Sequence, residues 1–282
     1  MTLAEIKISI KQLLSKKVEA IELNSLLGML IEEVTGWNRV QQVVEKNTPL
    51  TEAQIKKFNE YSQALLNDKP IQYILGKAWF MGVEYTVNEA VLIPRPETEE
   101  LVEWVVDYAN IIGKPLQVLD IGTGSGCIAI ALKKALASCS VTGLDISAAA
   151  LAVAKKNAAQ LNANIEWIEQ DILNNVILPT TYDVLVSNPP YIPMREKENM
   201  QEQVKNQEPA IALFVPNEDP LLFYRTIAQL AKKQLAPKGQ LFFEIHYDQG
   251  KAILHLLDEM HFHAEIRRDS FGKNRMIRAS LK

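Results

Sequence analysis

Over residues 1–69, apolar side chains recur at steps of three and four, the spacing that gathers them on one face of a helix. The first such set is Leu3, Ile6, Ile10, Leu13 and Leu14. A denser apolar run over residues 21–34 predicts a second, more heavily buried helix. Thr51 with Gln54 three residues later is typical of a capping box, so a third helix is expected to begin there. We therefore expect residues 1–69 to form a small helical bundle.

Residues 70–94 change to a strand-like pattern of short apolar runs. These runs cover residues 73–75, 80–85 and 90–93. Gly76 and Gly82 lie among them and allow turns or bulges. We expect this segment to form a β-hairpin that links two domains.

From residue 95 to the end of the chain, strand and helix patterns alternate. The expected strands are residues 117–121, 141–145, 165–168, 183–187, 240–245, 264–266 and 276–279. The expected helices are residues 96–109, 127–137, 148–161, 221–235 and 251–259. Strands that alternate with helices of about 10 to 15 residues favour the α/β class, with a doubly wound parallel sheet and right-handed crossovers. Only a short separation divides the last two strands, which favours an antiparallel edge.

Composition is that of an ordinary globular protein, with 48% hydrophobic and 23% charged residues among 282. The formal net charge of −4 argues against a protein whose main task is to grip nucleic-acid phosphates. No stretch is apolar enough to span a bilayer, and the N-terminus lacks the apolar core of a signal peptide. The two cysteines, Cys127 and Cys139, form neither a CxxC motif nor a disulfide framework. We expect a soluble cytoplasmic protein with no membrane partner and no direct binding of nucleic acid.

Residues 118–128 run from an expected strand through a glycine-rich turn into an expected helix. In open α/β sheets, ligands bind at such turns, outside the carboxyl ends of the strands. The turn reads Gly122-Thr123-Gly124-Ser125-Gly126. A dinucleotide fold would need its third glycine at Cys127, and no P-loop motif is present. The spacing is similar instead to the D/E-x-G-x-G-x-G loop of S-adenosylmethionine-dependent methyltransferases, and a turn with only a structural role stays open as an alternative.

Three acidic residues lie at the ends of the expected strands around this loop. Asp145 follows the glycines by about twenty residues and can accept hydrogen bonds from ribose hydroxyls; alternatively it caps the next helix, although Ser147 suits that role well. Asp171 is a candidate to accept from an adenine amino group, with Ile172 beside the ring, and alternatively is a solvated loop acid. Asp120 is expected near the charged end of the cofactor, where a carboxylate favours a sulfonium and an amino group.

The fourth expected strand ends in the sequence Asn188-Pro189-Pro190-Tyr191. Proline donates no N–H, so the two prolines rigidify a turn rather than continue a ladder. The Asn188 side-chain oxygen and the Pro189 carbonyl are then free to accept two hydrogen bonds from one planar NH2 group, on which Tyr191 can stack. The nitrogen of an amide or aromatic amine is a poor nucleophile because its lone pair is delocalised. Two acceptors would activate it by positioning and electrostatics, although such a motif can also serve only to end a strand.

With these motifs in view, the chain resembles the peptide chain release factor glutamine methyltransferases, the PrmC/HemK family. Further matching residues lie within 70–82, 91–102, 208–213, 244–250 and 269–275. The resemblance covers about residues 70–282, and the N-terminal helices agree only in type. One departure is His246, where the family usually has glycine, and it touches no catalytic motif.

The resemblance implies transfer of a methyl group from S-adenosylmethionine to the glutamine side-chain amide in the Gly-Gly-Gln tip of class I release factors, which terminate translation. The residues it implies for the cofactor are Asp120, Gly122, Thr123, Gly124, Ser125, Gly126, Asp145, Asp171, Ile172 and Asn188. Those it implies for the glutamine are Asn188, Pro189, Pro190 and Tyr191, with Asn188, Pro189 and Tyr191 catalytic.

The resemblance also implies a division of labour along the chain. Residues 1–69 would be a helical domain that helps to bind the release factor, and residues 70–94 would be the hairpin linker. Residues 95–282 would be a Rossmann-like S-adenosylmethionine-dependent methyltransferase domain. The segment 192–218 shows few structural signals and is long enough to suggest a role in covering the substrate.

Two other functions remain open at this point. An amino methyltransferase that acts on adenine in DNA or RNA would use the same Asn-Pro-Pro-Tyr chemistry, but the acidic composition and the missing basic recognition domain speak against it. A non-catalytic partner-binding protein on this fold is disfavoured by the intact glycines, Asp145 and Asn188. No metal is expected, because His261 and His263 are only a pair with no further clear ligand nearby.

Overall fold

The computed structural model describes residues 1–282 except 175, 177 and 179, and the chain divides into two compact units. Unit 1 contains Met1–Gly76 and Gln201–Gln207, and unit 2 contains Lys77–Met200 and Glu208–Lys282. None of the helices in the described part of the chain is long and apolar enough to cross a membrane. All the site residues named from the sequence fall in unit 2.

Unit 1 is helical, as the spacing of its apolar residues predicts. Its helices are α1 (Leu3–Leu14), α2 (Ala20–Thr35), α3 (Arg39–Val44), α4 (Glu52–Leu66), α5 (Ile71–Leu75) and α9 (Glu202–Gln207). The capping box expected at Thr51 is present: the Gln54 N–H donates to the Thr51 hydroxyl, and the Thr51 N–H donates to Gln54 Oε1. Leu30, Ile31 and Phe58 are fully buried in the core that α1, α2 and α4 share.

The strand expected at residues 73–75 is wrong, and so is the one at 90–93. Residues 71–75 form α5, because Pro70 occupies its N-cap and Gly76 ends it with a left-handed φ of 69°. Residues 90–93 join no ladder, and the Ile93 N–H donates instead to Glu208 Oε2. The run at residues 80–85 does lie in the expected antiparallel hairpin, which pairs β1 (Lys77–Phe80) with β2 (Val83–Thr86).

Unit 2 is built on a seven-stranded sheet with the strand order β10-β11-β9-β6-β3-β4-β5. The strands are β3 (Gln117–Ile121), β4 (Ser140–Asp145), β5 (Glu166–Glu169), β6 (Tyr182–Ser187), β9 (Leu235–Glu244), β10 (Phe262–Arg268) and β11 (Asn274–Leu281). The first five pair in parallel, whereas β11 is antiparallel to both β9 and β10. The parallel sheet and its antiparallel edge are therefore as expected.

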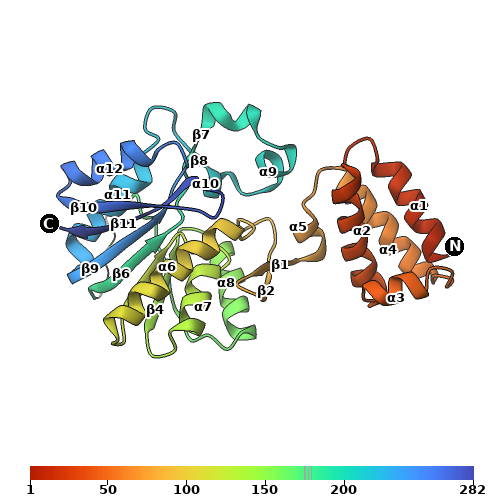
Figure 1. The fold of residues 1–282 in the computed structure, drawn as a ribbon, viewed down its shortest axis with the longest axis horizontal. Helices are drawn as coiled ribbons and strands as arrows, with labels where there is room; N and C mark the ends of the chain where they lie inside the picture. The colour runs from red at the N-terminus through yellow and green to blue at the C-terminus, as the bar shows by residue number, and fades with distance from the viewer. Residues whose placement is uncertain (175, 177, 179) are drawn as a thin grey trace. The chain divides into compact units, whose positions relative to one another are not determined.

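Helices cover both faces of this sheet (Figure 1). One face packs against α6 (Pro96–Ile112), α7 (Cys127–Ala135) and α8 (Ala148–Gln160), and buries Phe80 and Tyr85 of the hairpin in the same core. The other face packs against α11 (Leu222–Gln234) and α12 (Gly250–Glu259). The hairpin is thus part of the core of unit 2.

The direction of strand succession reverses at β3. From β3 the chain proceeds outward through β4 and β5, and then returns to β6 on the other side of β3. Helices on opposite faces therefore diverge at this point and leave a crevice beyond the carboxyl ends of the strands. Ile121, Asp145 and Ser187, the last residues of β3, β4 and β6, lie at this edge.

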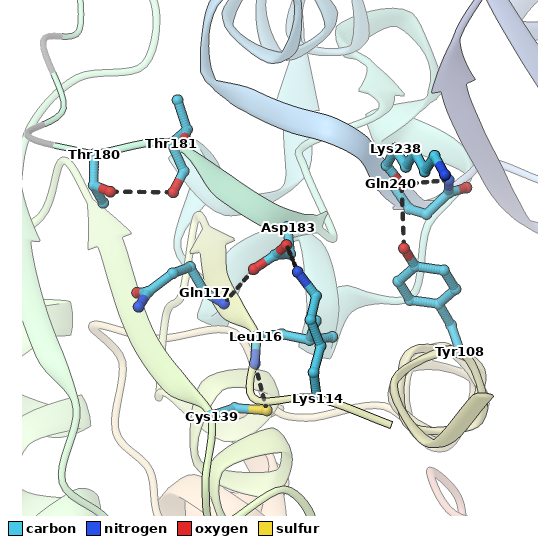
Figure 2. Close-up of polar contacts among 10 residues, drawn as sticks. All are labelled: Tyr108, Lys114, Leu116, Gln117, Cys139, Thr180, Thr181, Asp183, Lys238 and Gln240. Carbon is cyan, nitrogen blue, oxygen red and sulfur yellow. Dashed lines mark hydrogen bonds and ion pairs between the residues drawn. The ribbon is translucent and has the colours of Figure 1, made fainter. Parts of the chain in front are cut away.

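The opposite edge of the sheet is tied together by ordinary structural contacts (Figure 2). Asp183, near the start of β6, accepts from the Gln117 N–H at 2.9 Å and from Lys114 Nζ at 3.0 Å. The Leu116 N–H donates to Cys139 Sγ, which places this cysteine in the packing of the strand ends. Asp183 therefore offers a carboxylate at the edge of the sheet remote from the crevice.

Segment 192–218 is more regular than the sequence suggests. It holds β7 (Ile192–Pro193), the 3-10 helix η1 (Met194–Asn199), α9, α10 (Ala210–Leu213) and β8 (Phe214–Val215). Strands β7 and β8 pair in parallel as a small separate sheet. Elements of two to six residues are too short for a periodic pattern to reveal them.

Candidate functional site

A cavity with an empty volume of about 940 Å³, its open mouth included, lies at the carboxyl ends of β3, β4 and β6. Its size falls within the usual range of small-molecule sites. Of the residues named from the sequence, those that line it are Gly122, Gly124, Asp145, Asp171, Ile172, Asn188, Pro189 and Pro190. The glycine loop, both of these acids and the Asn-Pro-Pro turn, separated by many residues in the chain, therefore meet around one space.

The glycine loop crosses the floor of this cavity with its backbone exposed to it. Gly122, Gly124 and Gly126 have left-handed φ values of 73°, 54° and 80°, which glycine adopts without strain. A Cβ at Gly122 or Gly124 would meet no atom within 4 Å, so these positions are open toward a ligand. A Cβ at Gly126 would instead lie 3.1 Å from Ala154 of α8 and from Trp167 of β5, so this glycine allows the loop to pack closely against both elements.

Asp120 lies beneath the loop and does not line the cavity. Its Oδ2 accepts from the Thr123 hydroxyl at 2.5 Å and from the Ala129 N–H at 3.2 Å. Its Oδ1 is buried and has no partner among the described residues. Burial raises the pKa of Asp120 to about 7, against the lowering effect of those two hydrogen bonds. Thr123, like Ser125, is buried below the cavity rather than along its wall.

Asp145 joins the glycine loop to the end of β4. Its Oδ2 accepts from the Gly124 N–H at 2.8 Å, and its Oδ1 accepts from the Ser147 N–H at 2.9 Å. The helix cap is Ser147, whose hydroxyl accepts from the Ala150 N–H. Asp145 is therefore not the cap of α8, and each of its oxygens retains capacity to accept from a ligand in the cavity.

Asp171 and Ile172 lie side by side on the cavity wall after β5. The Asp171 carboxylate accepts from the Leu173 N–H and from Asn174 Nδ2, both at 2.9 Å. These bonds fix the carboxylate in a turn, while Ile172 adds an apolar surface beside it. The pair can receive a flat ring that carries a hydrogen-bond donor.

The Asn188 turn forms another wall of the cavity. Ser187 anchors it, because its hydroxyl donates to the Ile121 carbonyl at 2.7 Å. The Asn188 Nδ2 group donates to Thr98 Oγ1 at 3.2 Å. Among the described residues, no hydrogen bond reaches Asn188 Oδ1 or the Pro189 carbonyl. Two acceptors are thus available at this wall.

Tyr191 lies behind this wall and does not line the cavity. Its hydroxyl donates to Glu244 Oε1 at 3.4 Å, and burial raises the pKa of Tyr191. Its ring faces His246, with 5.7 Å between the ring centroids, and His246 Nδ1 contacts the Asp248 carboxylate. The histidine that departs from the family pattern therefore packs against the last residue of the Asn-Pro-Pro-Tyr motif. No group of three or more metal-ligating side chains is present among the described residues.

Three residues support the walls of the site, and the sequence motifs did not assign them a role. Thr98 and Glu244 are buried behind Asn188, and the Thr98 hydroxyl donates to Glu244 Oε2 at 2.6 Å. Glu208 is buried behind the part of the wall that includes Pro209. One signal was available for Glu244, because it is a carboxylate that directly follows the apolar run 241–243 at the end of an expected strand.

Two family models match this chain. Residues 108–208 match the methyltransferase small domain, and residues 8–76 match the PrmC N-terminal domain. The release factor glutamine methyltransferase of Flavobacterium psychrophilum is 42% identical over 274 residues, which cover 96% of each chain. That of Bacteroides thetaiotaomicron is 40% identical, over 92% of this chain and 93% of its own.

Solved structures of methyltransferases share the fold over much of the chain. A ribosomal protein L11 methylase from Lactobacillus delbrueckii aligns with a TM-score of 0.50 and 26% identity, over 70% of this chain and 84% of that one. A methyltransferase from Pyrococcus furiosus aligns with a TM-score of 0.52 and 15% identity, over 79% of this chain and all of that one. The second likeness concerns the fold alone.

Proposed function

The chain belongs to the release factor glutamine methyltransferase family, and from this premise we propose that it methylates the glutamine of the Gly-Gly-Gln tip of class I release factors. It is an S-adenosylmethionine-dependent protein-glutamine N-methyltransferase. The observation that carries the assignment within this chain is the meeting of Asn188 and Pro189 with the glycine loop and Asp145 around one cavity.

The residues of the cavity fit S-adenosylmethionine. Open space above Gly122 and Gly124 leaves room for a ligand against the backbone. The unpartnered Asp120 Oδ1 below them favours a cationic group in its neighbourhood. Asp145 retains acceptor capacity for ribose hydroxyls, and Asp171 with Ile172 can hold the adenine. When bound, the cofactor supplies an electrophilic methyl group.

The Asn188 turn would hold the glutamine. Its amide nitrogen is a poor nucleophile because its lone pair is delocalised into the neighbouring carbonyl. Asn188 Oδ1 and the Pro189 carbonyl can accept one N–H each, which fixes the plane of the NH2 group and favours positive charge on nitrogen. Positioning and preorganised electrostatics of this kind need no general base at the turn.

Pro190 and Tyr191 would give this turn its shape. Pro190 has no N–H and so adds no competing donor beside the two acceptors. Tyr191 would act as a support behind the turn, since its half-buried ring packs against His246 and its hydroxyl donates to Glu244. Asn188 and Pro189 would then be the catalytic residues that contact the glutamine, whereas Tyr191, expected from the sequence to stack on it, would act by positioning the turn.

Unit 1 would contribute to recognition of the release factor. Its match to the PrmC N-terminal domain over residues 8–76 supports a role particular to this family. Residues 1–69 would supply protein contacts, residues 70–94 would link them to the catalytic unit, and residues 95–282 would carry the chemistry.

A direct test uses radiolabelled S-adenosylmethionine with the full chain. Three acceptors are offered separately: a class I release factor, the same factor with the Gly-Gly-Gln glutamine replaced by alanine, and double-stranded DNA. We expect label on the first acceptor alone. Label on DNA would instead support the adenine alternative, which the family membership does not favour.

A further inference from the structure

Behind the Asn188 turn, four side chains form one continuous set of hydrogen bonds. Asn188 Nδ2 donates to Thr98 Oγ1 at 3.2 Å, the Thr98 hydroxyl donates to Glu244 Oε2 at 2.6 Å, and the Tyr191 hydroxyl donates to Glu244 Oε1 at 3.4 Å. Glu244 is 1% exposed and Thr98 is 3% exposed, so bulk water does not compete for these bonds. The set reaches from α6 through the end of β9 to the turn after β6.

The donor and acceptor properties of these groups fix the direction of each hydrogen bond in the set. An NH2 group only donates, so Thr98 Oγ1 accepts from Asn188 and has its one hydroxyl proton left for Glu244. An ionised carboxylate only accepts, so Glu244 receives protons from Thr98 and from Tyr191. With these directions, the NH2 group of Asn188 is used within the set, and its Oδ1 is the atom that stays free to accept a hydrogen bond.

We propose that Glu244 is a positioning residue that acts through Thr98 to hold the Asn188 amide with its oxygen available to the glutamine NH2. The inference rests on the proposed function, because it explains how Asn188 and Tyr191 would be fixed for that role. Neither Thr98 nor Glu244 lines the cavity, so each acts through another side chain. In the reverse orientation, Asn188 would present its own NH2 group to the NH2 group of the glutamine, and the two hydrogen-bond donors would repel each other.

The backbone around Glu244 is also held in place. The Tyr224 hydroxyl donates to the Glu244 carbonyl at 3.2 Å, and Met276 of β11 lies opposite Glu244 in the sheet register. Both the main chain and the carboxylate of Glu244 are therefore fixed. A buried network that is fully satisfied in this way specifies one arrangement of its members.

Protonation of Glu244 would remove this control. Burial raises the pKa of Glu244 to about 7, although the Thr98 hydrogen bond and the charge of Arg275 favour the ionised form. The titratable and charged groups that face it are Glu97 on α6, Cys127 on α7, Tyr191 after β6, Tyr224 on α11 and Arg275 on β11. His246, two residues further along the chain, packs on the Tyr191 ring.

A protonated carboxyl group is a donor on one of its oxygens. If it donates to Thr98, Glu244 no longer accepts the Thr98 hydroxyl proton, which is then free to point toward Asn188 and to stabilise the reverse orientation of the amide. If it donates to Tyr191, the bond that fixes the Tyr191 ring reverses instead. Either outcome loosens the acceptor site, so kcat/KM for the release factor is expected to fall as the pH decreases through about 7.

The first experiment compares Thr98→Val with Thr98→Ser in the full chain, with a class I release factor as substrate. Valine keeps the shape and removes the relay, so kcat should fall by about 10- to 100-fold with little change in affinity for S-adenosylmethionine. Serine keeps the hydroxyl and should retain most of the wild-type rate. In an Asn188→Ala background, Thr98→Val should add no further loss, because its effect passes through Asn188.

The second experiment measures the pH dependence of kcat/KM for Glu244→Gln between pH 5.5 and 9. Glutamine does not titrate, so the fall of kcat/KM below about pH 7 should disappear, and kcat/KM at pH 8 should be several-fold lower than wild type. Asp183→Asn is the matched control, because it neutralises a carboxylate at the far edge of the sheet. It should keep the wild-type pH profile.

The outcomes separate this inference from the function on which it rests. If the wild-type chain does not label the release factor, the proposed function fails. If it does, the inference is overturned by any of three results: a wild-type rate for Thr98→Val, a full further loss from Thr98→Val in the Asn188→Ala background, or an unchanged low-pH fall in Glu244→Gln. If Glu244→Gln does not fold, the comparison of Thr98→Val with Thr98→Ser and the double variant with Asn188→Ala still test the inference.

Discussion

Arg95 and Glu208 are 113 residues apart in the chain and form an ion pair at 2.5 Å. The other carboxylate oxygen of Glu208 accepts from the Ile93 N–H at 3.2 Å. The Glu208 side chain is only 1% exposed. Glu208 thereby ties the segment after the hairpin to the segment that begins at Pro209, and both segments line the cavity.

Removal of this carboxylate should weaken unit 2. Glu208→Ala leaves the Ile93 N–H and the Arg95 guanidinium without their acceptor, and we expect a loss of about 2–3 kcal/mol in the free energy of unfolding. Urea denaturation of the full chain measures it. Asp258→Ala removes an exposed partner of Lys282 and should leave the midpoint unchanged. Equal shifts for the two variants would contradict the structural role of Glu208.

Asn188→Ala separates transfer from cofactor binding. The substitution removes one of the two acceptors for the glutamine NH2, and we expect kcat to fall by about 10²- to 10³-fold. Calorimetric titration with S-adenosylmethionine should show an affinity close to wild type. Asn110→Ala, at an exposed position of α6, is the control and should change neither quantity. Wild-type turnover on a release factor by Asn188→Ala would refute the acceptor role.

Asp145→Ala should act on the cofactor. The carboxylate is the proposed acceptor for the ribose hydroxyls and also holds the Gly124 N–H, so we expect about a 10- to 100-fold weaker affinity for S-adenosylmethionine. Asp145→Asn keeps one acceptor oxygen and should lose less. Asp107→Ala removes an exposed carboxylate on α6 and serves as the control. An unchanged dissociation constant for both Asp145 variants would exclude the ribose assignment.

The parts of the fold that follow from local periodicity were predictable from the sequence. The seven strands of the main sheet and the helices α6, α7, α8, α11 and α12 appear close to where the apolar pattern places them, and the antiparallel edge follows from the short connection before β11. Residues 71–75 were misjudged because a run of five residues between Pro70 and Gly76 is too short to distinguish a strand from one helical turn. The glycine loop and the Asn188 turn were found because each follows a recognisable strand.

The residues behind the site depend on contacts that no local pattern contains. Thr98 and Glu244 are 146 positions apart and meet only after β9 has paired with β6 and α6 has packed on the sheet. Asp120 was expected near the cofactor and stays a proposed neighbour of it, but only the structure shows that its carboxylate lies below the loop, with one oxygen that has no partner among the described residues. Long-range packing determines both arrangements, so the sequence alone predicts the motif residues but not the residues that hold them in place.

Asp120 should make the stability of the protein depend on pH. Burial raises its pKa from 3.8 in the unfolded chain to about 7 in the folded protein, so between these values the folded state binds more protons. The contribution of Asp120 to stability is therefore largest below about pH 4 and is lost as the pH rises through 7. Asparagine does not titrate, so the stability of Asp120→Asn relative to wild type should increase over this interval by about 3–4 kcal/mol.

Urea unfolding of both proteins at pH 4.5, 6 and 8 measures the difference, and contributions from other groups such as Glu244 cancel because both proteins contain them. A difference that stays constant across the three pH values would mean that Asp120 is ionised in the folded state throughout and that burial does not raise its pKa.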